Sequence, residues 1–229
     1  MNKLLTSVLA LSAVSFTALA DEEKHHEDPT RIVTKAGLAY NDNGIQFQGS
    51  VGLDEARMLN AQVNKDASEW RLGGSWLLPM GILNFNFSRS EFDPEGHRNN
   101  YSVGTFVPLS YFDITPNDWQ IFPMAGYAYN DGEIAGEYIE SDNEYVMARF
   151  SSHGAYAGVF GVKPLTDTWS VLAFGGGSIG SDNYSGYWVG SGLSYKISEA
   201  QSFNFFGILS EDDFGENNRA GISYTYTFN

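Results

Sequence analysis

The sequence predicts an all-β protein, a closed antiparallel transmembrane β-barrel of twelve strands, with ten strands as the alternative. The first observation is the regular alternation of apolar and polar residues, which is clearest in Arg219–Phe228. The second is the even spacing of turn residues. The third is a signal peptide with no later apolar stretch of the roughly 20 residues that a membrane helix needs. Since alternation alone also fits a soluble sandwich, the other segments have to separate the two folds.

Residues 1–20 have the pattern of a secretory signal peptide. Lys3 gives a basic start, an apolar stretch follows, and Ala18-Leu19-Ala20 forms a small-residue cleavage site before Asp21. A membrane anchor is the weaker interpretation, because the stretch is short and interrupted by serine and threonine. We therefore expect export, with residues 21–31 as an acidic, disordered periplasmic tail and residues 32–229 as the barrel.

Composition excludes several classes of protein. The 229 residues carry a formal net charge of −15, so nucleic acid is not an expected partner. The chain contains no cysteine, which excludes disulfides and a lipid-modified N-terminal cysteine. An exported protein of this kind depends on strand pairing for its stability.

Alternating segments recur along the whole chain. One face of each is apolar or aromatic, and the other is polar and rich in glycine. This pattern suits a barrel with lipid outside and a polar lumen inside. The clearest segments are 70–78, 83–88, 101–109, 187–195 and 219–228.

Turn residues set the predicted strand count. Five turns at one end, one of them a longer link, and six loops at the other separate twelve strands, and both chain ends lie on the turn side, the expected periplasmic side. The turns are expected at 54–56, 79–81, 110–118, 163–167 and 198–200, and the loops at 41–44, 64–68, 92–99, 130–144, 180–185 and 211–218. The first hairpin is ambiguous, because the count would fall to ten if residues 36–51 formed one bulged strand and residues 58–64 were a loop. We favour twelve, with the last strand pairing with the first, near Ala36 to Tyr40.

The aromatic residues are sorted by strand end, as in barrels with aromatic belts at both membrane interfaces. A soluble core would not sort them in this way. The predicted interface residues at the short-turn end are Trp76, Trp119, Trp169 and Tyr195, and those at the long-loop end include Trp70 and Tyr187.

With these features the chain resembles the small, porin-like outer-membrane β-barrel proteins of Gram-negative bacteria. The resemblance covers the mature chain but identifies no subfamily. It implies contact with outer-membrane lipids and lipopolysaccharide, and insertion by the barrel-assembly machinery. In that family the last strand carries an aromatic assembly signal, here Tyr224, Tyr226 and Phe228, which Asn229 shifts by one residue. The oligomeric state stays unknown.

Strand phase predicts which side chains line the lumen. The inward bases are expected to be Arg71, Arg149, His153, Lys163, Lys196 and Arg219, joined by Lys35. The inward aromatic residues, which could close the bore, are expected to be Phe106, Phe122, Trp188 and Phe206. A basic lumen predicts a passive channel that favours anions, or an envelope-structural barrel if the bases form a paired network.

Two alternatives remain open. The barrel could bind a surface through its acidic loops, or it could be a lipid-modifying enzyme that uses His153 beside Ser151. No acid is placed to orient this histidine, so we predict no catalysis and no cofactor. Metal binding has weak candidates in the acidic residues of 91–97 and 211–216 and in His25 and His26. Neither acidic loop has the spacing of a calcium loop, so we expect no metal site.

Overall fold

The structure is a computed structural model that describes residues 24–92, 96–139 and 144–228. Within these ranges no helix is long and apolar enough to cross a membrane. Three short 3-10 helices lie in connections of the described residues: η1 (Leu109–Phe112), η2 (Pro116–Asp118) and η3 (Ser181–Asn183). The strands are β1 (Thr34–Asn41), β2 (Gly44–Gly52), β3 (Arg57–Asn64), β4 (Glu69–Leu78), β5 (Gly81–Phe92), β6 (Gly96–Phe106), β7 (Gln120–Ile139), β8 (Glu144–Pro164), β9 (Trp169–Gly180), β10 (Ser185–Ser198), β11 (Gln201–Asp212), β12 (Gly215–Glu216) and β13 (Arg219–Phe228).

Antiparallel pairing of neighbours in the chain builds the sheet, and β1 closes it by pairing with β13. Ala36 lies opposite Tyr226, as expected for a barrel whose first and last strands meet. The two-residue β12 pairs with β11 inside a loop, so β1–β11 and β13 form the twelve-stranded wall. The prediction of a closed twelve-stranded barrel is confirmed, and the ten-stranded alternative is wrong.

The first hairpin shows why twelve is correct. The side chain of Asn41 accepts a hydrogen bond of 2.9 Å from the backbone N–H of Asn43, and Gly44 has a φ of 95°. An Asx turn followed by a glycine in the left-handed region ends one strand and starts the next. This turn chemistry makes residues 36–51 two strands.

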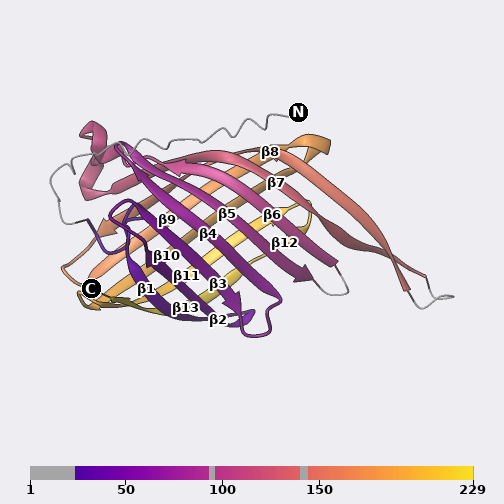
Figure 1. The fold of residues 1–229 in the computed structure, drawn as a ribbon, viewed down its shortest axis with the longest axis horizontal. Helices are drawn as coiled ribbons and strands as arrows, with labels where there is room; N and C mark the ends of the chain where they lie inside the picture. Colours follow the sequence, from indigo (N-terminus) through magenta and orange to yellow (C-terminus); the bar gives the residue numbers. More distant parts are fainter. Residues whose placement is uncertain (1–23, 93–95, 140–143, 229) are drawn as a thin grey trace, which may run out of the picture.

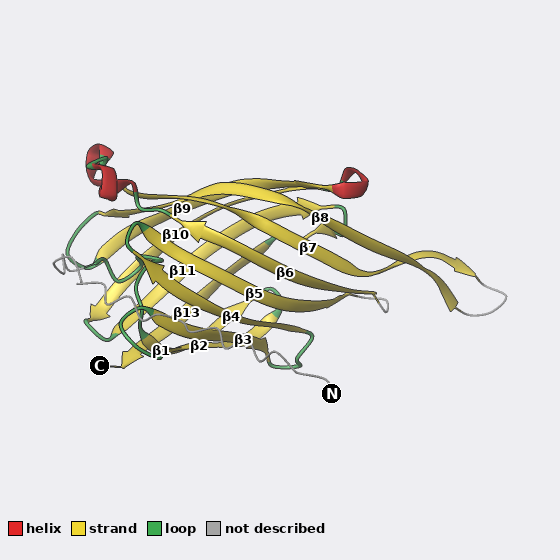
Figure 2. Cartoon of the chain, turned by 45° about the horizontal axis from the view of Figure 1, so that its top comes forward, coloured by secondary structure: helices red, strands yellow, loops and turns green. Residues whose placement is uncertain are grey.

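The two ends of the barrel differ, as Figures 1 and 2 show. We call the end where residues 34 and 228 lie the turn end, and the opposite end the loop end. The turn end carries the long connection between β6 and β7, with η1 and η2. At the loop end β7 and β8 extend beyond the other strands as a two-stranded arm (Figure 1). The predicted loop 130–144 is therefore wrong for most of its length, because backbone pairing continues to Ile139 and Glu144.

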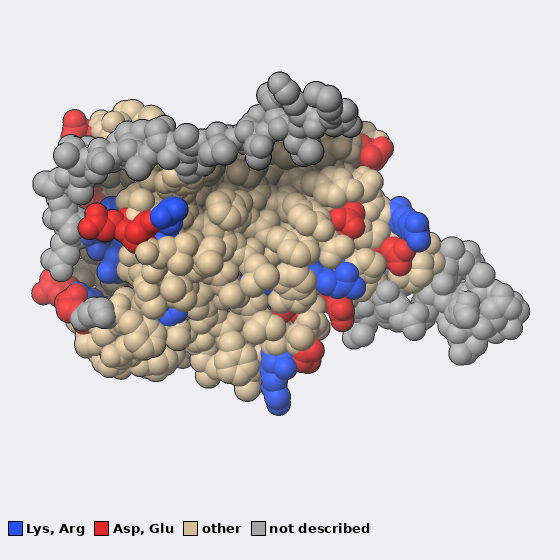
Figure 3. All heavy atoms as spheres, in the orientation of Figure 1, with Lys and Arg blue, Asp and Glu red and all other residues tan. Residues whose placement is uncertain are grey.

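On the face drawn in Figure 3, the outer wall between the two ends is largely uncharged. Figure 3 shows most charged side chains near the two ends of one face. Large apolar side chains project outward, among them Phe85, which is 49% exposed. Many inward positions instead hold buried polar residues such as Gln46 and Ser194. This apolar exterior and polar interior fit a barrel in lipid and not a soluble sandwich.

The last strand has the predicted alternation. Tyr226 and Phe228 face outward and are 38% and 52% exposed, whereas Ser223 faces inward and is buried. The aromatic side chains of β13 therefore lie on the lipid-facing surface. Their role as an assembly signal stays a prediction.

Candidate solute passage in the barrel lumen

A cavity of about 540 Å³ lies inside the barrel. On one side of the turn end the lumen is packed, because Ile82, Phe122 and Val162 face inward and are buried. The cavity lies beside this packed part and is lined mainly by polar side chains, including Gln46, Gln48, Gln62, Ser88 and Asn204. Amide and hydroxyl groups at a lumen wall can replace part of the hydration shell of a passing solute.

Positive charge exceeds negative charge among the residues that line the cavity. The bases are Arg31, Lys35, Arg71, Arg98 and Arg219, and the acids are Glu27, Glu69 and Glu199. Arg89 also borders the cavity, but it shares the outward face of β5 with Phe85 and binds Glu91. This is an excess of two positive charges inside a chain whose formal charge is −15. The sign of the lumen is therefore opposite to that of the whole molecule.

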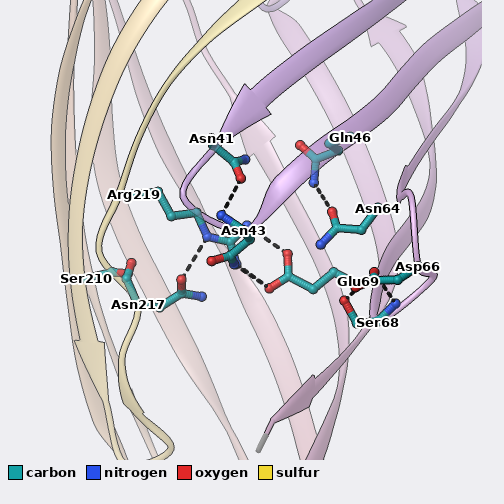
Figure 4. A network of polar contacts seen from close by, with 10 residues as sticks. All are labelled: Asn41, Asn43, Gln46, Asn64, Asp66, Ser68, Glu69, Ser210, Asn217 and Arg219. Carbon is teal, nitrogen blue, oxygen red and sulfur yellow. Dashed lines mark hydrogen bonds and ion pairs between the residues drawn. The ribbon is translucent and has the colours of Figure 1, made fainter.

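Arg219 is neutralised by Glu69. Its guanidinium donates two hydrogen bonds of 2.8 and 2.6 Å to the two oxygens of this carboxylate. Figure 4 shows Asn217 and Asn43 completing the network: Asn217 accepts a bond of 2.8 Å from Nε of Arg219, and Asn43 donates one of 3.2 Å to Glu69. Because β13 and β4 are not neighbours in the sheet, this ion pair joins separate parts of the wall.

A second ion pair crosses the lumen near the loop end. Arg98 on β6 binds Asp212 on β11, two strands that are not neighbours in the sheet. The hydroxyl of Tyr184 donates a bond of 3.3 Å to the same carboxylate. The guanidinium also lies 5.0 Å from the ring centre of Phe214, whose ring meets that of Phe150 edge-on at 4.8 Å. This cluster narrows the lumen and satisfies the charge of Arg98.

Arg71 has no such partner. In the described part of the chain its side chain makes no hydrogen bond or ion pair, and it lies beside the cavity opposite Ser88 of β5. The charged groups that act on it are Arg219, Glu69 and Arg98. The single acid among them is already bound to Arg219, so Arg71 leaves an uncompensated positive charge at the wall.

The predictions for β8 require correction. Arg149, His153 and Lys163 were expected to face inward, but they share the outward side of β8 with Val159, which is 44% exposed. Arg149 is 88% exposed and binds Glu133 at 3.0 Å on the outer surface. Ser151 shares this face, so the pair proposed for catalysis lies outside the lumen.

The phase of β8 is set by its large inward residues. Tyr156 and Phe160 point into the lumen, where the adjacent Gly104 and Gly126 leave room for the tyrosine ring. The outward side of the same segment carries Ala155, Ala157 and Val159, which are small enough to resemble a lumen face in the sequence. Glycines on neighbouring strands were the signal that could have revealed the correct phase.

The other predicted lumen residues face inward. Lys196 binds Glu199 at 2.6 Å, and Phe206 borders the cavity. Phe106, Phe122 and Trp188 also occupy inward positions of their strands. Sequence reasoning missed Arg98, which lay in a segment predicted to be a loop, and Arg31, which lay in the predicted disordered tail.

The predicted interface aromatic residues lie near strand ends. At the turn end Trp76 and Trp169 face outward, and Trp169 lies 4.7 Å from Tyr195 between ring centres. Trp119 packs over the outer face of Gly161. At the loop end Tyr187 is 52% exposed, and Trp70 meets Phe87 edge-on. Their arrangement as two membrane belts stays a prediction.

The metal candidates do not form a site within the described ranges, where no group of three or more histidine, cysteine, aspartate or glutamate residues is arranged to hold an ion. Two members of the first acidic loop, Asp93 and Glu95, lie outside those ranges. His25 and His26 bind serine hydroxyls of the barrel wall instead. Residues 24–31 thus lie against the wall, and the expectation of a disordered tail is wrong for them.

Comparisons with known proteins concern the fold. No protein-family model and no curated protein sequence matches the chain. The translocator domain of the autotransporter NalP from Neisseria meningitidis is 12% identical, with a TM-score of 0.56 over 85% of each chain. A bacterial polysaccharide outer membrane secretin is 10% identical, with a TM-score of 0.51 over 81% of this chain and 69% of that one. The NanC porin is 10% identical, with a TM-score of 0.48 over 86% of this chain and 99% of that one. These matches concern the fold alone: the chain is a closed β-barrel like those of the outer-membrane translocator domain and the secretin.

Proposed function

We propose that the protein is a small passive channel of the outer membrane that favours anions, with both chain ends in the periplasm. The observation that carries this proposal is Arg71, a base beside the lumen cavity without an acidic partner. The shared fold of porins and channels supports a porin-like barrel, and the lining of this chain supports the preference for anions.

The charge balance explains why anions would be favoured. Arg98 and Arg219 are held by acids, so their effect on a distant ion is largely cancelled. Arg71 and Lys35 make no ion pair within the described residues, and both border the cavity. Fixed positive charge on the wall of a narrow lumen attracts anions and repels cations, which makes the channel selective for anions without any tight binding site.

A planar-bilayer experiment tests the proposal. The refolded protein is recorded with potassium chloride at different concentrations on the two sides, so that the reversal potential reports which ion crosses more easily. We expect discrete conductance steps and a reversal potential that is shifted toward the equilibrium potential of chloride. A reversal potential that is shifted toward the equilibrium potential of potassium would contradict the proposed selectivity.

A further inference from the structure

The chain before β1 turns back into the mouth of the barrel at the turn end. Nε2 of His25 lies 2.8 Å from the hydroxyl oxygen of Ser170 on β9, and Nε2 of His26 lies 2.9 Å from that of Ser194 on β10. In the sheet β13, β11 and β10 separate β1 from β9. The segment therefore crosses from the foot of β1 to a distant part of the wall.

Glu27 strengthens this crossing. Its Oε1 accepts hydrogen bonds of 3.0 Å from the hydroxyl of Ser194 and 3.0 Å from the side-chain amide of Asn204 on β11. Ser194 is fully buried, so the contact seals that part of the wall from water. His26, Glu27 and Arg31 all border the lumen cavity, so residues of the segment form one boundary of the solute passage.

The segment is fixed to the barrel just before β1, and it has its own local fold. The carbonyl of Val33 accepts a bond of 2.6 Å from Ser50, and the hydroxyl of Thr34 accepts one of 3.0 Å from the backbone of Gly52. Further back, Asp28 accepts two bonds of 2.7 Å from Thr30, which is 2% exposed. The contacts of Val33 and Thr34 would hold the segment at the mouth even if the crossing contacts were broken.

The crossing contacts are polar and few. Such a hydrogen bond makes only a small net contribution, because each partner can bind water when it is released. The contacts of His25, His26 and Glu27 with the wall are of this kind, so docking can be reversed at moderate cost.

The two histidines lie in a crowded electrostatic environment. Their ring centres are 4.2 Å apart, and the segment itself adds Glu27 and Arg31. From the wall, β10 contributes Lys196 and the following turn contributes Glu199, whereas β9 and β11 present the uncharged Ser170 and Asn204. Burial and then the neighbouring His26 lower the pKa of His25 from 6.5 to about 4, and burial also lowers the pKa of His26.

We propose that residues 24–33 form a tethered plug that closes the turn-end mouth of the lumen and leaves it when His25 and His26 take up protons. The gating consequence rests on the proposed channel function, whereas the docking itself does not. The plug is part of this chain, so it acts at a fixed high local concentration and needs no partner protein.

The direction of the pH effect follows from the two states. A released His25 titrates near 6.5 and the docked one near 4, so docking is strongest above pH 6.5 and weakens as the pH falls toward 4. A pKa difference of about 2.5 corresponds to at most about a 300-fold loss in the docking equilibrium, and the half-buried position of the ring reduces this value. Acid therefore favours the open mouth.

Two measurements test the plug. The chain after residue 20 is compared with a variant that also lacks residues 21–30, and heat-modifiable gel mobility verifies that both are folded barrels. Histidine NMR titration reports the pKa of His25, which is assigned with His25→Ala, and bilayer recordings report conductance at pH 7.5 and pH 5. His153→Ala is the matched control, because it removes a histidine from the outer face of β8.

We expect His25 to titrate near 4, the longer chain to conduct several-fold more at pH 5 than at pH 7.5, and the truncated chain to conduct freely at both. The control should retain the pH response of the longer chain. If His25 titrates near 6.5 and truncation leaves conductance unchanged, the plug is overturned while the channel stands. If His25 titrates near 4 but neither chain conducts, docking is supported and the channel function is overturned.

Discussion

Neutralising Arg71 should weaken the preference of the channel for anions. The substitution Arg71→Gln removes a charge without an ion-pair partner in the described structure and retains a polar, though shorter, side chain. The Arg219–Glu69 pair, which is bonded through both carboxylate oxygens, should stay intact. The substitution therefore changes the electric field in the lumen and leaves the ion pair in the wall in place.

The size of the effect follows from Coulomb's law. An ion that passes about 5 Å from the guanidinium in water interacts with it by about 0.8 kcal/mol. This energy raises the local concentration of an anion about fourfold and lowers that of a cation about fourfold. At low salt the ratio of chloride to potassium permeability should therefore fall by at most about 16-fold, and by less in high salt, where the charge is screened.

The assay is the reversal potential in a potassium chloride gradient. Arg149→Gln is the matched control, because Arg149 lies on the outer face and is 88% exposed. It should leave the permeability ratio unchanged. The reasoning would be refuted if Arg71→Gln kept the parental ratio, or if the two variants shifted it equally.

Two further predictions concern the stability of the wall. Glu69→Gln leaves Arg219 without a carboxylate at a site where both side chains are about 15% exposed. It should lower the free energy of unfolding by about 2 kcal/mol, measured in urea titrations of the refolded barrel. The control Glu216→Gln, on the exposed β12, should change this free energy little. Ile82→Ala creates a cavity at a fully buried site and should cost about 2–5 kcal/mol in the same assay, against about 1 kcal/mol for the lipid-facing Val159→Ala; equal costs for the two would contradict the packed interior.

Much of the fold could be predicted because alternation and turn chemistry are local. Residues such as Asn41 and Gly44 define a hairpin through their own conformational preferences, and β13 has a continuous contrast between its two faces. The strand count and the closure of β1 on β13 followed from these signals.

Contacts between distant strands limited the prediction of the site. The phase of β8 depends on whether Tyr156 finds space inside, and that space comes from Gly104 and Gly126 on β6 and β7. Pairing of Arg98 with Asp212 depends on two strands that meet only across the lumen. The docking of His25 depends on Ser170, 145 residues away, so an acidic and polar segment was interpreted as a disordered tail.

The central claim is that water and anions reach Arg71 inside the barrel, and thiol modification at its neighbour tests it directly. Ser88 lies opposite Arg71, and the chain has no cysteine of its own, so Ser88→Cys gives a single reporter in the lumen. Modification rates are measured with a negatively and a positively charged methanethiosulfonate, and Asn183→Cys on the exposed loop end supplies the reference ratio. We predict that Ser88→Cys reacts and favours the negative reagent several-fold more than the reference does. A thiol that does not react, or that favours the positive reagent, would contradict a basic, water-filled passage.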